Sequence, residues 1–410
     1  MTPIEIEFPD GQRYTREWLE EHPDDAQQLL RRCKGSYPRC LCRPPGQSLY
    51  IAHRARFYLA RLPNTGPQHA PTCPSYEPET AWCGRGIYSA KALEERGESL
   101  HLKLASPLAI RGGVMAEPRA VVAQVSTSHS AREALGLRGL LHLLWERAEF
   151  SRWRPTMQGR RHYRQVYKYI LEAADSIWVR RQALTRHLYI PEPFDSTQRL
   201  QIEARRQRAL SERSTTASGA PLRVLVAGQV RSITPMESAQ DGIRLAHVPQ
   251  EFVIRAPRPA LSRLRQETEF AWLDWPNLYS DFRLMVLFTM QRNREGQWSI
   301  EDLAGMVTTA EYIPVLSMED ALLAQQLLQQ SRTFCKPLPY DGAACRLPAY
   351  LLLDCGTCAV PLEVIGRQDA EVAVQLSRIE QYREQGTVHW QWDYRDTPAP
   401  PPLPVTGNGN

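Results

Sequence analysis

Two tight pairs of metal-binding residues near the N-terminus constrain the fold of this 410-residue chain more than any other feature. Cys40 and Cys42 precede residues 48–63, where alternating apolar and polar positions predict a β-hairpin, and His69 and Cys73 follow that segment. Because a hairpin returns the chain on itself, the two pairs can converge on one point. Three thiolates and one imidazole fill a tetrahedral zinc site and leave no position for water. The sequence therefore predicts structural rather than catalytic zinc.

Other cysteines leave alternatives open. Cys33, His53 and Cys83 lie near the four expected ligands, and any of them could replace one. The competing interpretation is a set of buried free thiols with a surface histidine. A second group of cysteines lies near the C-terminus. We expect these to be free thiols in a tight turn, and an all-cysteine zinc site is the alternative. The members of this group are Cys335, Cys345, Cys355 and Cys358.

Bulk composition places the chain among ordinary globular proteins. Hydrophobic residues make up 42% and charged residues 23%, which supplies enough apolar material for sizeable cores. No apolar run approaches the length that crosses a bilayer, and the acidic start lacks the basic and apolar stretches of a signal peptide. We therefore expect a soluble, cytoplasmic protein with no membrane partner and with two or three domains.

The changing pattern along the chain predicts an α+β multidomain protein. Strand-like alternation dominates the first part, helical spacing the middle, and alternating strands and helices the last part. A small polar segment tipped by Gly and Pro marks the best linker. The expected parts are a β-rich zinc-binding module over 1–128, a basic helical region over 129–213, a linker over 214–221, an α/β domain over 222–396 and a flexible tail over 397–410.

The helical region carries a concentration of positive charge. Residues 135–174 predict two helices, and the second opens on arginines interleaved with aromatic residues. Such a helix pair can be a helix-turn-helix or winged-helix variant, with residues 177–188 as the wing. Arginines neutralise phosphates and aromatic rings stack on bases, so the segment is a candidate DNA or RNA interface. A solvated helical bundle is the alternative. The candidate contact residues are Arg154, Arg160, Arg161, Arg164 and Lys168.

Within the last domain the pattern predicts several further elements. Residues 222–230, 252–255 and 282–290 have the composition of strands, whereas 300–307 is expected to form a short helix. A nuclease-like core is expected over 318–394, in the order helix, strand, strand, helix and strand.

Three runs within that core resemble the core of PD-(D/E)xK nucleases. They are FCKPLPY at 334–340, LPAYLLLD at 347–354 and VPLEVIG at 360–366. The same segment, with residues 69–78 and 135–153, resembles a bacterial domain-of-unknown-function family carried on integrative and conjugative elements. The first resemblance implies a nuclease-like fold, and the second implies a role on a mobile genetic element.

The chemistry of such nucleases requires carboxylates that hold Mg²⁺ and a lysine that orients water. Glu363 matches the acid of the third motif, but Ala349 and Ile365 stand where the pattern has its aspartate and its lysine. Asp354 and Glu319 are the candidates for replacement carboxylates, with Asp341 as an alternative to Asp354. Magnesium is expected only if the fold is an active nuclease. The departures favour a degenerate, non-catalytic core.

The sequence therefore leads to one function with two alternatives. We expect a nucleic-acid-associated accessory protein of a mobile genetic element, with structural zinc and an inactive nuclease-like fold. The first alternative is a metal-dependent DNA nuclease centred on Glu363. The second is a protein-interaction scaffold with no nucleic-acid role.

Overall fold

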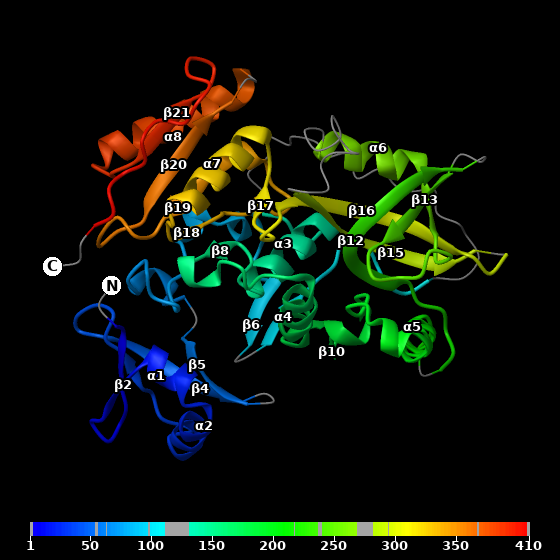
Figure 1. The fold of residues 1–410 in the computed structure, drawn as a ribbon, viewed down its shortest axis with the longest axis horizontal. Helices are drawn as coiled ribbons and strands as arrows, with labels where there is room; N and C mark the ends of the chain where they lie inside the picture. The colour runs from blue at the N-terminus through cyan, green and yellow to red at the C-terminus, as the bar shows by residue number, and fades with distance from the viewer. Residues whose placement is uncertain are drawn as a thin grey trace. The chain divides into compact units, whose positions relative to one another are not determined.

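The computed structural model has α+β architecture, with helices α1 to α8 and strands β1 to β21 (Figure 1). It describes residues 3–53, 56–62, 64–96, 99–110, 131–216, 218–236, 240–268, 282–293, 295–366 and 369–407. The chain forms two compact units, each assembled from separated segments. Unit 1 comprises Met1–Cys83, Ser331–Pro337 and Cys345–Asn410, and unit 2 comprises Gly84–Gln330 and Leu338–Ala344. The domains expected from local pattern are continuous segments, so their boundaries differ from those of the units.

An antiparallel sheet forms the N-terminal part of unit 1, in the strand order β2-β1-β3-β4-β5. Strands β4 and β5 are the hairpin expected from the alternating pattern. Helix α2 buries Leu29 and Leu30, and the side-chain amide of Gln27 both donates to and accepts from the backbone of Phe57 at 2.8 Å. The elements are β1 Glu5–Glu7, β2 Arg13–Thr15, α1 Arg16–Glu21, α2 Pro23–Arg32, β3 Arg39–Cys40, β4 Gln47–His53 and β5 Phe57–Arg61.

The C-terminal part of unit 1 contains a sheet in the order β21-β20-β19-β18. Strands β20 and β21 are parallel, and α8 connects them. Leu351 and Leu353 belong to the same buried cluster as Ile6 and Leu49, so segments from both ends of the chain share one hydrophobic core. The elements are β18 Phe334–Cys335, β19 Tyr350–Leu352, β20 Val360–Ile365, α8 Asp369–Glu384 and β21 Trp390–Asp393.

The segment after β21, expected to be flexible, is hydrogen bonded within unit 1. Trp390 Nε1 donates to the Pro402 carbonyl at 3.0 Å, and Arg332 donates to the Pro404 carbonyl at 2.8 Å. The Gly407 amide donates to the Asp354 carbonyl at 2.9 Å. These bonds attach the Pro-rich segment to the C-terminal part of the unit.

Unit 2 contains two sheets. The smaller has the strand order β10-β9-β7-β6, and the larger has the order β11-β12-β13-β14-β16-β15, with β17 paired to β16 and β12 also paired to β15. Of the longest strands, β15 and β16 are mostly buried, and β12 is buried mainly in its first half. The strands are β6 Leu93–Arg96, β7 Ser99–Leu102, β8 Arg152–Trp153, β9 Ile177–Val179, β10 Gln182–Ala183, β11 Leu188–Tyr189, β12 Val224–Pro235, β13 Gln240–Leu245, β14 Ile254–Pro257, β15 Phe282–Arg292, β16 Trp298–Thr309 and β17 Pro314–Val315.

Helix α3 forms the centre of the unit 2 core. Eight of its residues are buried, including Leu140, Leu144 and Trp145, because its leucines occupy almost every face. They share one cluster with residues of α4, β12, β15 and β16. The helices of this unit are α3 Leu137–Arg147, α4 Tyr163–Asp175, α5 Arg199–Arg213, α6 Arg258–Glu267 and α7 Met318–Gln329.

A distant carboxylate caps the N-terminus of α3, because the N-cap residue Gly136 has no side chain. Asp341 accepts from the amide of Gly136 at 2.7 Å and from the amide of Gly139 at 2.9 Å. The Tyr88 hydroxyl donates to the same carboxylate at 2.6 Å. Burial first, and then the charge of Asp341, raise the pKa of Tyr88. Asp341, an alternative metal ligand in the sequence analysis, therefore anchors a helix.

One expected element is wrong. Residues 300–307 were expected to form a helix, but they lie in β16, which pairs along its length with β15. The segment contains good helix formers, so tertiary pairing overrides local propensity. Strands β9 and β10 form a hairpin within residues 177–188, the segment expected to be the wing, and the winged-helix interpretation stays a prediction.

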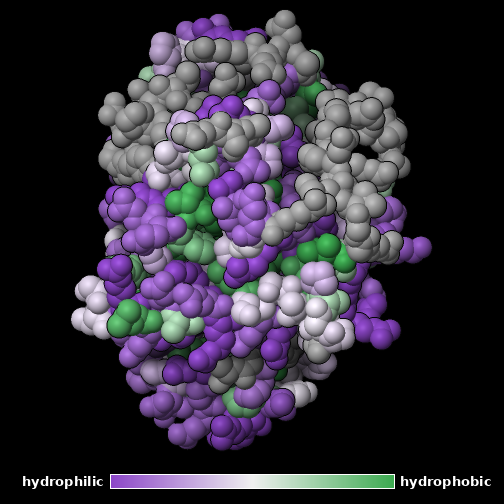
Figure 2. Space-filling model, turned by 90° about the vertical axis from the view of Figure 1, so that its right-hand side faces the viewer, coloured by the Kyte–Doolittle hydropathy of each residue, from purple (hydrophilic) through white to green (hydrophobic). Residues whose placement is uncertain are grey.

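The surface drawn in Figure 2 is mostly hydrophilic, with hydrophobic residues in separated areas. Among the described residues, none of the helices combines the length and the apolar character that crossing a bilayer requires.

We expect Asp341→Ala to lower the free energy of unfolding by about 2–4 kcal/mol, because it removes a helix cap and takes away the carboxylate to which the Tyr88 hydroxyl donates. Glu251→Ala, at an exposed position of the same unit, should change it by less than about 0.5 kcal/mol. Urea denaturation of both variants is the measurement. Equal stabilities would show that the capping contacts contribute little.

Candidate metal centre

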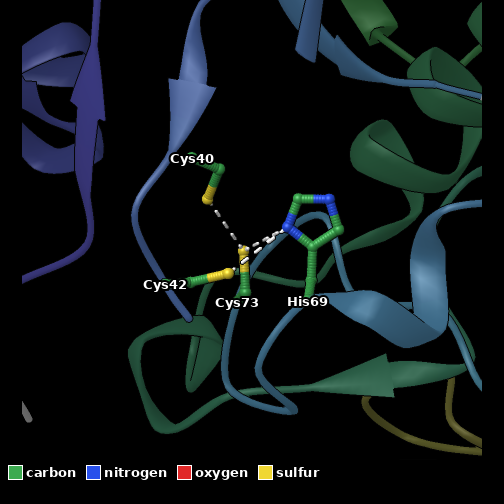
Figure 3. A group of neighbouring side chains, drawn as sticks. All are labelled: Cys40, Cys42, His69 and Cys73. Carbon is green, nitrogen blue, oxygen red and sulfur yellow. Dashed lines mark hydrogen bonds between the residues drawn. The ribbon is translucent and has the colours of Figure 1, made fainter. Parts of the chain in front are cut away.

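The four expected zinc ligands lie on two short segments of unit 1. Cys40 ends β3, and Cys42 lies in the turn that follows. His69 ends the 3-10 helix Gly66–Gln68, and Cys73 occupies the next turn. Cys40, His69 and Cys73 are fully buried, and Cys42 is half-buried. Turns on either side of the β4–β5 hairpin therefore present the side chains toward each other, as Figure 3 shows.

The ligand atoms all lie within 4.8 Å of one another. The Cys40 and Cys73 sulfurs are 3.6 Å apart, and His69 Nδ1 is 3.4 Å from the Cys42 sulfur and 3.6 Å from the Cys73 sulfur. Tetrahedral zinc, with bonds of about 2.3 Å to sulfur and about 2.0 Å to nitrogen, separates its ligands by about 3.5–3.8 Å. The spacing is therefore compatible with structural zinc.

Backbone amides point at two of the sulfurs. The amide of Ala70 donates to the Cys42 sulfur and the amide of Ser75 donates to the Cys73 sulfur, each at 3.4 Å. Hydrogen bonding within the group lowers the pKa of the Cys73 thiol and raises that of Cys40. The two backbone amides favour the thiolate form of the sulfurs that they contact, and metals bind cysteine in this form.

The imidazole of His69 is fully buried. Its Nδ1 faces the sulfurs, while its Nε2 is buried without a hydrogen-bond partner in the described part of the chain. Metal-bound histidines usually donate a hydrogen bond from their second ring nitrogen to a carbonyl or carboxylate, and His69 differs from them in this respect within the described residues. The group does not include the three residues that could have replaced one of the four ligands, which are Cys33, His53 and Cys83.

The expected catalytic acid Glu363 is committed to an internal ion pair. Its side chain is 1% exposed, and Arg378 donates to its two oxygens at 2.7 and 2.5 Å. The Tyr382 hydroxyl donates to the same carboxylate at 3.1 Å. Arg378 also donates to the carbonyls of Cys345 and Leu347, so it ties α8 to β20 and to the loop before β19. The contacts of Glu363 are those of a structural residue.

Asp354 is engaged in the same way. Arg332 donates to both of its oxygens, with a shortest distance of 2.7 Å, and the Thr333 amide donates at 2.7 Å. Glu319 lies in the first turn of α7, in unit 2. In the described ranges, the Cys40–Cys42–His69–Cys73 set is the only group of three or more His, Cys, Asp or Glu residues within reach of one ion.

The C-terminal cysteines do not form a comparable group in the part of the chain that the structure describes. Cys335 is buried, Cys345 and Cys355 are half-buried and Cys358 is exposed. The Cys355 sulfur lies 3.2 Å from the Arg332 guanidinium, and burial raises the pKa of its thiol. The preference for free thiols over a second zinc site stays a prediction.

The candidate nucleic-acid residues divide by exposure. Arg160, Arg164 and Lys168 are exposed, and Arg154 is half-buried. Arg161 instead faces its own unit, since it donates to the carbonyls of residues 149, 150 and 152 and lies over two aromatic rings at 5.1 and 5.2 Å. Burial lowers the pKa of Arg161 to about 10. Its guanidinium is therefore occupied within the fold.

We expect Glu363→Gln to lower the free energy of unfolding by about 3–5 kcal/mol, because Arg378 stays buried without its counter-charge. Glu380→Gln on the same helix breaks an exposed pair with Arg383 and should cost less than about 1 kcal/mol. Thermal and urea denaturation measure both changes. A stable Glu363→Gln protein would remove the structural assignment and return Glu363 to the catalytic candidates.

Comparison with known proteins gives a family. The family model described as "Protein of unknown function (DUF1173)" matches residues 14–395. No curated protein and no solved structure matches the chain. Since the family model spans nearly the whole sequence, the chain belongs to the DUF1173 family.

Proposed function

We propose that this chain is a non-catalytic nucleic-acid-binding protein whose unit 1 is held together by one structural zinc ion. The proposal joins three features: the buried Cys/His cluster, the internal pairing of two of the three expected catalytic acids, and an arginine-rich surface on unit 2. The observation that carries the binding role is the exposed basic start of α4, where Arg160 and Arg164 form no ion pair with any described residue.

Zinc is favoured for the cluster by its ligand chemistry. Soft thiolates and an imidazole in four-coordinate spacing select zinc over magnesium or calcium, which require oxygen ligands. Cys40 and Cys73 also pack into the hydrophobic core of unit 1. An ion bound there would link β3 to the turn at Cys73, and all of its ligands would come from the protein.

Metal analysis of the purified protein should find about one zinc per chain. The Cys73→Ser variant should lose the zinc, and its free energy of unfolding should fall, because structural zinc supplies on the order of 10 kcal/mol in small zinc modules. Cys358→Ser is the matched control, since this thiol is exposed and lies outside the cluster. A protein free of metal with unchanged thermal stability would contradict the zinc assignment.

Composition supports a polyanionic partner. Only five of the 50 Lys and Arg residues are lysines, and the net charge is +5. Arginine forms bidentate contacts with phosphate, which lysine cannot. Arg160 lies just before α4 and Arg164 lies in its first turn. Lys168 lies one turn further along, 3.9 Å from Glu172 and over the ring of Tyr169. Arg160 and Arg164 can approach a phosphate backbone without breaking an ion pair within the described residues.

We expect salt-sensitive binding of DNA or RNA in a mobility-shift assay. Arg160→Ala with Arg164→Ala should weaken binding and make it less sensitive to salt, because each arginine that neutralises a phosphate adds about one to the slope of log affinity against log salt concentration. Arg383→Ala, an exposed arginine of unit 1, should leave binding unchanged. Absence of any binding at low salt would overturn the proposal and favour the interaction-scaffold alternative.

A cleavage assay tests the nuclease alternative. No cleavage of plasmid or oligonucleotide is expected with Mg²⁺ or Mn²⁺, because both oxygens of Glu363 already accept from Arg378. Cleavage that Glu363→Gln abolishes, in a variant that still folds, would establish the alternative instead. Both the nuclease-like core and the role on a mobile genetic element come from sequence resemblance and stay predictions.

A further inference from the structure

A large groove in unit 2 is not explained by the features described so far. It has a volume of about 1170 Å³ and lies among the segment after β7, the β9–β10 hairpin and the 3-10 helix Leu184–Arg186. Pockets for small molecules usually measure about 300–1,000 Å³. The size of the groove therefore suits a segment of an extended ligand.

The groove is lined by more positive than negative side chains. Its cations are Lys103, Arg180, Arg181 and Arg186, and its anions are Asp175 and Glu212. Within the described residues, none of the four cations takes part in an ion pair, whereas Asp175 accepts a hydrogen bond from Thr185 at 3.4 Å. Unpaired cations along one groove repel each other and attract polyanions.

The hairpin that carries two of these cations has an unfavourable backbone. Arg180 and Arg181 form the two-residue turn between β9 and β10, with φ of 49° and 73°. Both values lie in the left-handed region, where such turns usually have Asn-Gly because a Cβ is disfavoured. Strain of this kind is retained mostly at functional positions. Two arginines in this turn place two guanidinium groups beside the groove at a cost in stability.

An aromatic ring also lines the groove. Trp178, on β9, is half-buried and stacks on His101 with ring centroids 5.8 Å apart and an interplanar angle of 26°. A tryptophan among arginines is the arrangement with which proteins bind unpaired nucleic-acid strands, because the ring stacks on a base and the cations contact the phosphates. Bases within a duplex are already stacked on each other and are not available in this way.

We propose that this groove binds single-stranded nucleic acid, with its phosphates on Lys103, Arg180, Arg181 and Arg186 and a base against Trp178. This inference rests on the proposed nucleic-acid function and assigns it a site and a strand type. Single-stranded DNA and single-stranded RNA share the required chemistry, so the measurement includes both.

The test uses the full chain and fluorescence anisotropy with labelled single-stranded DNA, single-stranded RNA and duplex DNA of equal length. Arg180→Asn with Arg181→Gly removes two charges and supplies the residues that the turn favours. We expect this variant to melt at a higher temperature and yet bind single strands at least about tenfold more weakly. Trp178→Ala should weaken single-strand binding without changing its salt dependence, because it removes stacking and no charge.

The matched control is Arg199→Gln with Arg208→Gln, which removes the same charge from exposed positions on α5. If the control and the turn variant weaken binding equally, the groove is not the site. If the wild-type chain binds duplex only, the groove proposal fails and the proposed function stands; if it binds nothing, both fail. Should the turn variant not fold, Lys103→Gln with Arg186→Gln decides in its place, and unchanged single-strand binding would overturn the proposal.

Discussion

The convergence of three sulfurs and one imidazole nitrogen is the constraint on which unit 1 depends. The strands around it are short, between two and seven residues, and α2 buries only three side chains against them. A sheet of this size buries little apolar surface by itself, and small modules usually add a metal or disulfides. The proposed zinc ion would fix the turns on both sides of the β4–β5 hairpin. The core that contains Cys40 and Cys73 continues into the C-terminal strands.

Elsewhere in the protein, arginine side chains link separate segments of the chain. Arg378, Arg332 and Arg161 each satisfy several carbonyl or carboxylate oxygens inside the fold. A guanidinium has five donors in a fixed plane, so one side chain can join two or three segments. In the C-terminal part of unit 1, Arg378 neutralises Glu363 and Arg332 neutralises Asp354, so these carboxylates are paired with arginine rather than open to a metal ion. The arginine content of the chain therefore reflects internal bonding as well as surface charge.

Features set by residues that are close in the sequence can be predicted from it, whereas features set by contacts between distant segments cannot. The Cys/His cluster is predictable because each ligand pair is local and a single hairpin separates them. Arg161 is a candidate for a nucleic-acid interface because the sequence shows its charge but not that its guanidinium lies over Phe150 and Trp153. Residues 300–307 have the local pattern of a helix, whereas their strand partner, β15, decides the conformation. The groove was missed because its lining comes from separate segments, although consecutive arginines between two short strand-like runs were a visible signal.

The discontinuous make-up of unit 1 has a consequence for synthesis on the ribosome. Its first segment ends at Cys83 and the next begins at Ser331, so the N-terminal sheet emerges about 250 residues before its partners in the shared core. At about 5–20 residues per second, that interval lasts on the order of 10–50 seconds. During this time the nascent N-terminal segment must shield its apolar face without Leu351 and Leu353. If the four ligands bind the proposed zinc as soon as they emerge, the growing chain has a means of holding that segment in shape until its last residues are made.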